Sequence, residues 1–172
     1  MKPARPTGLE SRAEPADHLA LRLWPRLLSC GTEIENEIRK RLRNDFSMTL
    51  SRFDYLAQLH REPQGLRMTD LSRRLMVTGG SVTGLTDELE KEGFVAREDD
   101  PLDRRSWRLR LTSDGRRVFE AAAGAHEQWV VELFSGLAAA DRRQLHELLG
   151  RLRKQLSAQL DTPTADTTDA TS

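Results

Sequence analysis

The sequence has little of several features that define common protein classes. It has one cysteine, Cys30, in 172 residues, which excludes an internal disulfide and a zinc site of several thiolates. Its four histidines show no metal-ligand spacing with that cysteine, so we expect no metal and no cofactor. No run of apolar residues approaches the length of a membrane span, so we expect no membrane partner.

Catalytic motifs and an excess of one charge are also missing. We find no nucleophile paired with a base, no glycine-rich phosphate loop and no metal cluster, so we predict that the protein is not an enzyme. Lys plus Arg and Asp plus Glu number 27 each, so any binding to nucleic acid needs a local concentration of cations. Residues 1–16 lack the apolar segment of a signal peptide, and a cytoplasmic location is expected.

The length suits one compact domain with polar tails. Residues 1–16 and 161–172 are poor in apolar side chains, which predicts two disordered tails. Apolar residues at three- and four-residue steps predict a long helix over 20–46 and a shorter one over 50–60. Pro25 interrupts the first helix, which either begins near Leu23 or is kinked one turn earlier.

Two short helices and a hairpin follow. We expect helices over 70–75, with Thr69 as N-cap, and over 79–92, with Thr78 as N-cap and Gly93 just past the end. The apolar period then changes to two, which predicts a β-hairpin with its turn at 99–101. Long helices are expected from Thr112 or Ser113 to about 134 and over 139–160.

This order of elements predicts a mainly α fold with a small β-hairpin wing, the winged helix-turn-helix. Residues 49–112 would form the DNA-binding region, and residues 17–48 and 113–160 the long N- and C-terminal dimerisation helices. In this plan the helix over 79–92 enters the major groove of double-stranded DNA, and the wing reaches the flanking backbone or minor groove.

The proposed recognition helix carries small and hydroxylated side chains opposite its apolar side. Val82, Leu85 and Leu89 share the apolar side. Small residues allow close approach to base edges, and hydroxyls can bond to bases or phosphates. The alternative is a helix start that is merely rich in glycine. The predicted DNA contacts on this helix are Thr78, Gly80, Ser81, Thr83 and Thr86.

The hairpin concentrates arginine. Five arginines lie along it, at 97, 104, 105, 108 and 110, and the pair Arg104 and Arg105 falls at the tip. Asp103 can fix the rotamer of a neighbouring guanidinium. The alternative is a solvated hairpin of mixed charge, since carboxylates at 98, 99 and 100 lie there too. The predicted wing contacts are Arg97, Asp103, Arg104 and Arg105.

These residues resemble a known signature. Asp103-Arg104-Arg105, followed by Leu109-Arg110-Leu111-Thr112 and Gly115, resembles the wing-to-helix segment of MarR-type regulators, the multiple antibiotic resistance family. The segments 71–75, 82–83 and 85–95 resemble the helix-turn-helix of the same family. The resemblance implies a homodimer with interlocked first and last helices, a pseudo-palindromic operator and release by a small ligand, as in a repressor. Ala138, where a Ser or Thr often caps the last helix, and Pro25 depart from the family pattern.

A leucine stripe on the last helix supports dimerisation independently. A helix so apolar on one face must be covered, and a second protomer is the simplest cover. Packing on its own chain is the alternative. The predicted interface residues are Leu145, Leu148, Leu149, Leu152 and Leu156.

The resemblance to the family implies an effector site. In the family, aromatic residues of the first, second and fifth helices line a cavity between the dimerisation and DNA-binding parts. Such residues are alternatively plain core. The candidates are Trp24, Phe46, Phe53, Tyr55, His126 and Trp129. The segments 29–30, 34–38, 75–80 and 82–87 resemble regulators of aromatic-acid catabolism, some of which respond to hydroxycinnamoyl-CoA thioesters. Such an anion would be attracted by Arg39 and Arg43, which lie near Lys40 and Arg41 in the sequence. Alternatively, these cations form the solvated end of a long helix or contact DNA phosphates.

Two other functions remain open. A winged helix can serve as a protein-interaction module, whose binding need not weaken steeply with salt as DNA binding does. Cys30 could sense peroxide as the thiol of a redox regulator, but it lies on the apolar stripe of the first helix and has no second thiol.

Overall fold

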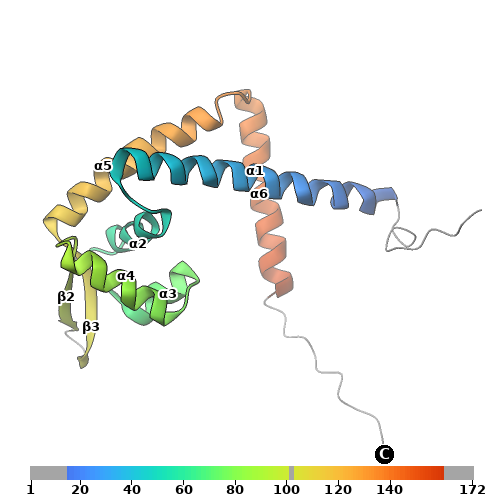
Figure 1. The fold of residues 1–172 in the computed structure, drawn as a ribbon. Coiled ribbons are helices and arrows are strands. Elements are labelled where there is room, and N and C mark those ends of the chain that lie inside the picture. The colour runs from blue at the N-terminus through green and yellow to red at the C-terminus, as the bar shows by residue number, and fades with distance from the viewer. Residues whose placement is uncertain (1–14, 101–102, 161–172) are drawn as a thin grey trace, which may run out of the picture. The chain divides into compact units, whose positions relative to one another are not determined.

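The structure is a computed structural model that describes residues 15–100 and 103–160, with side chains at 18–100 and 107–159. It divides into two compact units, one up to Trp129 and one from Val130. The elements in chain order are α1 (Pro15–Phe46), α2 (Leu50–His60), β1 (Leu66–Arg67), α3 (Met68–Leu75), α4 (Gly79–Lys91), β2 (Val95–Asp100), β3 (Asp103–Leu111), α5 (Ser113–Leu133) and α6 (Ala139–Leu160) (Figure 1). The predicted mainly α fold with a small β-hairpin wing is confirmed.

Helix α1 runs through Pro25 and begins earlier than expected. It starts at Pro15, inside the predicted tail, although residues 1–14 lie outside the described part. A proline removes one helical hydrogen bond, and here the long helix on both sides maintains the geometry. Among residues 18–46 of α1, only Ile38 and Leu42 are buried, whereas Trp24 is 64% exposed. Cys30, which the sequence placed on the apolar stripe of this helix, is exposed as well in the single chain.

Helices α2, α3 and α4 form the helix-turn-helix. Thr49 caps α2 by accepting a hydrogen bond from the Arg52 N–H, and Thr78 caps α4 by accepting one from the Ser81 N–H, as predicted for Thr78. The cap predicted at Thr69 is wrong, because β1 passes directly into α3 and Arg67 occupies the cap position. Gly93 follows α4 with φ 78°, as the predicted C′ glycine requires.

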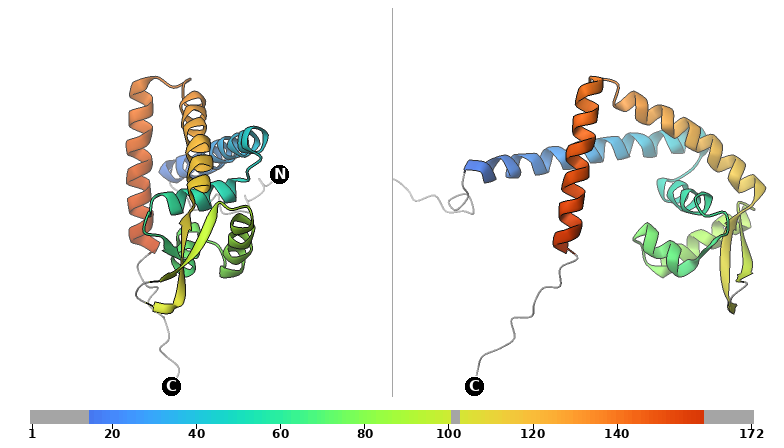
Figure 2. Two further views of the ribbon diagram at one scale, coloured as in Figure 1. Left: turned by 90° about the vertical axis from the view of Figure 1, so that its left-hand side faces the viewer. Right: turned by 180° about the vertical axis from the view of Figure 1, so that it is seen from behind.

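A three-stranded antiparallel sheet of order β1-β3-β2 packs beside these helices. Leu66 pairs with Leu109, and Val95 pairs with Leu111. Strand β1 was not predicted, because two residues are too few to show a period. Strand β2 continues through Asp100, which the sequence had placed in the turn. The β2–β3 hairpin projects beyond helices α2–α4 (Figure 2).

The core of this region joins every element of the winged helix. Its fully buried side chains come from α2, α3, α4 and the strands, and include Leu56, Leu71, Leu89, Val95 and Leu109. Burying each such side chain contributes about 1.5–3 kcal/mol relative to its exposure. This packing fixes the faces that α4 and the wing turn outward.

Helices α5 and α6 begin where the sequence placed them. Thr112 precedes α5; its Oγ1 donates to the Gly93 carbonyl at 2.6 Å and accepts from the Gly115 N–H at 3.0 Å. In the second unit, Leu145 of α6 is half-buried, and all other residues of α6 with described side chains are exposed. No helix in the described ranges is long and apolar enough to cross a membrane.

Candidate nucleic-acid interface

The first turns of α4 present a surface without bulky side chains. Thr78, Gly80, Ser81 and Thr83, all predicted DNA contacts, are exposed, as are Gly79 and Gly84. A Cβ added at Gly79, Gly80 or Gly84 would meet nothing within 4 Å. Thr83 Oγ1 donates to the Gly79 carbonyl at 3.0 Å, which leaves the hydroxyl oxygen able to accept another bond. A flat surface such as a base edge can therefore approach this helix closely.

Thr86 does not belong to that surface. Its side chain is fully buried, and its Oγ1 donates to the Val82 carbonyl at 2.7 Å. Because the hydroxyl proton of Thr86 is used in that bond, Thr86 Oγ1 accepts a hydrogen bond from the Tyr55 hydroxyl, also at 2.7 Å. Burial raises the pKa of Tyr55 to about 12, so this donor stays protonated at neutral pH. The prediction that Thr86 contacts DNA is wrong, because its hydroxyl joins α4 to α2.

Arg97, at the base of the wing, is held by α4. Its guanidinium bonds to the Asp87 carboxylate and ion-pairs with Glu90, with 3.2 Å between Nη1 and Oε2. The hydrogen bond to Asp87 raises the pKa of Arg97. Two nitrogens of the Arg97 guanidinium are thus engaged by carboxylates of α4, out of the five N–H donors that an arginine carries. The contacts shown here orient the wing relative to the recognition helix.

A buried carboxylate connects the three strands. The Asp100 side chain is 0% exposed and ion-pairs with Arg67 of β1, with 2.7 Å between Oδ2 and Nε. The same Oδ2 lies 3.2 Å from Nε of Arg108 on β3. Arg110 ion-pairs with Glu98 across the hairpin. The sequence had treated Arg108 and Arg110 as part of a cationic surface, whereas the structure uses both within the sheet.

The tip of the wing holds the remaining predicted contacts. The backbone of Asp103, Arg104 and Arg105 opens strand β3, and Asp100 pairs with Asp103 across the turn. The side chains of Asp103, Arg104 and Arg105 lie outside the described part of the chain. Sequence reasoning overlooked Trp107, whose side chain is 55% exposed on the same strand and offers an indole N–H to a partner.

Four of the six predicted effector residues form two pairs. The rings of Phe46 and Trp129 lie 6.1 Å apart edge to face, and those of Phe53 and His126 lie 4.9 Å apart. Trp24 does not join them, because it precedes Phe46 by 22 positions of one helix, roughly 33 Å at 1.5 Å per residue. Tyr55 is fully buried against Thr86. Including Trp24 and Tyr55 in one cavity wall is therefore wrong within a protomer.

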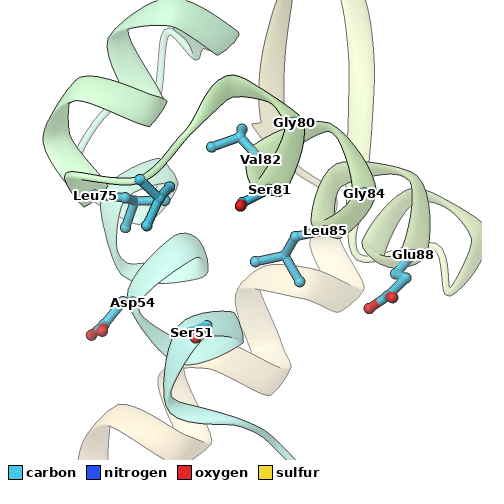
Figure 3. Close-up of a pocket in the computed structure, with 10 residues that line it drawn as sticks. Ser51, Asp54, Leu75, Gly80, Ser81, Val82, Gly84, Leu85 and Glu88 are labelled. Carbon is cyan, nitrogen blue, oxygen red and sulfur yellow. The ribbon is translucent and has the colours of Figure 1, made fainter.

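Two cavities lie elsewhere. A hollow of about 210 Å³ is lined by Arg39 and Arg43 of α1 and by residues 49–51 at the start of α2. A larger cavity of about 510 Å³ lies between α2, the α3–α4 turn and α4 (Figure 3). Asp54 and Glu88 line the larger one. Burial raises the pKa of Asp54, while His126 and Arg61 act to lower it.

Comparison with known proteins shows which family has this architecture. Residues 48–107 match the family model described as the MarR family. The chain is 35% identical over 116 residues to the uncharacterized HTH-type transcriptional regulator YkoM of Bacillus subtilis (strain 168), covering 67% of this chain and 73% of that protein. The chain belongs to the MarR family. MarR-family proteins are DNA-binding regulators and not enzymes, and the relatives of this chain are named accordingly.

Two further similar proteins are informative. The transcriptional activatory protein BadR of Rhodopseudomonas palustris is 32% identical over 116 residues, which cover 66% of each protein. Sco3205 of Streptomyces coelicolor, a MarR-family regulator solved in complex with DNA, is 26% identical with a TM-score of 0.72, covering 92% of this chain and 97% of that one. The fold of this MarR-family chain thus extends over nearly the whole of a DNA-bound relative.

Proposed function

We propose that this MarR-family chain binds a pseudo-palindromic operator as a homodimer and regulates transcription in response to a small ligand. Helix α4 enters the major groove, and the wing contacts the flanking backbone or minor groove. The observation that carries the proposal is the exposed surface of α4 at Thr78, Gly80, Ser81 and Thr83, which holds no side chain larger than threonine. A helix face of the usual solvated kind would carry lysine and glutamate.

Dimerisation is supported by apolar side chains that each unit leaves in solvent. On α6, Leu148, Leu149, Leu152 and Leu156 are 40–48% exposed. On α1, Leu19, Leu21, Leu23 and Trp24 are 55–64% exposed. Exposed apolar stripes of this kind mark protein contacts, and a second copy of the chain presents the same stripes. A two-fold dimer places its two α4 helices one turn of duplex apart, about 34–36 Å, or a multiple of it.

The direction of regulation is proposed to be repression, relieved by the ligand. The relative BadR is named an activatory protein, which makes activation the second candidate. A reporter gene behind the operator distinguishes them, since deleting the regulator raises expression under repression and lowers it under activation.

The effector is proposed to be a small aromatic anion, such as an aromatic acid or its CoA thioester. The paired rings of Phe46 with Trp129 and of Phe53 with His126 suit stacking, and Arg39 and Arg43 line a hollow at the N-terminus of α2. Calorimetry with p-coumaroyl-CoA and with free p-coumarate tests this. If neither compound binds, the proposal of an anionic aromatic effector is rejected. If both bind equally, the proposal that the protein contacts the CoA group is rejected.

The wing assignment is tested by Arg105→Ala. We expect operator affinity to fall by about 1.5–3 kcal/mol on all duplexes, and the slope of affinity against salt to become shallower by about one charge, because one charge-assisted phosphate contact is lost. The measurement is fluorescence anisotropy with labelled duplex at several salt concentrations. Arg117→Ala is the matched control, since that arginine lies on α5 beside Asp114. If Arg105→Ala binds as tightly as Arg117→Ala, the wing assignment is wrong.

A further inference from the structure

The larger cavity, of about 510 Å³, is lined by residues of α2, of the end of α3 with the turn after it, and of α4, and none of the paired ring residues lines it. Leu75, Val82 and Leu85 point toward one another across it (Figure 3). Ser51 of α2 and Ser81 of α4 add hydroxyl groups. The volume lies in the range of sites that hold small organic molecules, and such sites combine apolar side chains with a few polar groups.

The charged residues that line this cavity are both acidic. Asp54 and Glu88 lie at opposite sides of the apolar centre (Figure 3). Most carboxylates of the helix-turn-helix and wing are neutralised by arginine, as Asp87, Glu92 and Glu98 are. Among the described side chains, neither Asp54 nor Glu88 has an ion-pair or hydrogen-bond partner. Two unpaired carboxylates beside an apolar surface favour a cation that carries apolar groups.

We propose that this cavity is a binding site for an organic cation with an apolar body, whose charge is met by Asp54 and Glu88 and whose body lies against Leu75, Val82 and Leu85. The site differs in its charged groups from the hollow beside Arg39 and Arg43 that is proposed for an aromatic anion, although Ser51 lines both. Gly80 and Gly84 of α4 line it, so the occupant lies against the backbone of the helix that carries the proposed DNA surface. An effect of the occupant on operator binding rests on the proposed function, whereas the binding site itself does not.

The test is direct binding to the full chain in the absence of DNA. Tetraphenylphosphonium is the probe, and tetraphenylborate, with the same shape and the opposite charge, is its matched control. We expect calorimetry to detect the phosphonium and to find the borate at least tenfold weaker. Failure of the phosphonium to bind, or equal binding of both ions, would overturn the proposal without bearing on DNA binding.

Three variants locate the site. Asp54→Asn and Glu88→Gln are each expected to weaken phosphonium binding about fivefold, since each removes one nearby opposite charge. Gly84→Leu, at a position where an added Cβ meets nothing within 4 Å, is expected to fill the cavity and weaken binding by more than tenfold. Asp45→Asn makes the same charge change outside the lining. Thermal melts followed by circular dichroism check that each variant folds. If the three site variants bind the phosphonium as tightly as Asp45→Asn does, the phosphonium binds elsewhere and the proposal is contradicted.

Discussion

Gly115→Ala is expected to destabilise the protein by about 3 kcal/mol, because an added Cβ here makes the closest contact found at any glycine of the described residues. A Cβ at this position would lie 1.9 Å from the Phe94 carbonyl oxygen and 2.8 Å from its carbon. These are backbone atoms, fixed by the hydrogen bond from the Thr112 N–H to the same oxygen at 3.1 Å. The helix α5 would have to move away from the base of the wing, and overpacking of this kind costs about 1–3 kcal/mol or more.

The matched control for this substitution lies on the same helix. A Cβ at Gly124 meets nothing within 4 Å, so Gly124→Ala is expected to raise stability by about 0.5–1 kcal/mol through helix propensity alone. Urea unfolding followed by circular dichroism measures both variants. If Gly115→Ala unfolds at the same urea concentration as Gly124→Ala, the close approach of α5 to Phe94 is not a feature of the folded protein.

A double substitution on α6, Leu148→Glu with Leu152→Glu, is expected to produce a monomer and to weaken operator binding by more than a hundredfold. These leucines are 48% and 40% exposed in the single chain, so carboxylates there leave its own packing nearly unchanged. In the proposed dimer the same positions would bury four unpaired charges, which is strongly unfavourable. A monomer would retain only one half-site, so the two recognition helices would no longer act together.

The control adds the same charges elsewhere on that helix. His146→Glu with Ser157→Glu places two carboxylates outside the leucine stripe, on exposed positions, and is expected to remain dimeric. Analytical ultracentrifugation at micromolar concentration compares the two. A leucine variant that sediments as the unmodified protein does would refute the assignment of α6 to the interface.

Elements with a clear period could be predicted from sequence, and elements fixed by tertiary contacts could not. The spacing of Val82, Leu85 and Leu89 predicted α4, and Thr78 and Gly93 predicted its ends. Thr86 was misplaced because its residue type favours a surface, although its position, four after Val82 and three before Leu89, lies on the buried side. A buried threonine is explained only by its partner Tyr55, on another helix.

The wing shows the same limit for charged residues. Five arginines in a hairpin predicted a cationic surface, but Arg97 and Arg108 are engaged by carboxylates of the fold. Asp100 is buried because β1 brings Arg67 against it, and a two-residue strand leaves no sequence signal. Ion pairing between segments that are distant in sequence therefore decides which cations remain for a partner, and it arises only in the folded chain.

The central claim is that two copies of this chain bind one duplex through paired α4 helices and wings. Selection of bound duplexes from a random pool by the purified full-length protein tests it most directly. The account predicts enrichment of an inverted repeat whose half-sites are centred about 10 base pairs, or a multiple of one turn, apart, with affinity that falls steeply as salt rises. Recovery of no shared sequence, or of single half-sites bound by one copy, would contradict it.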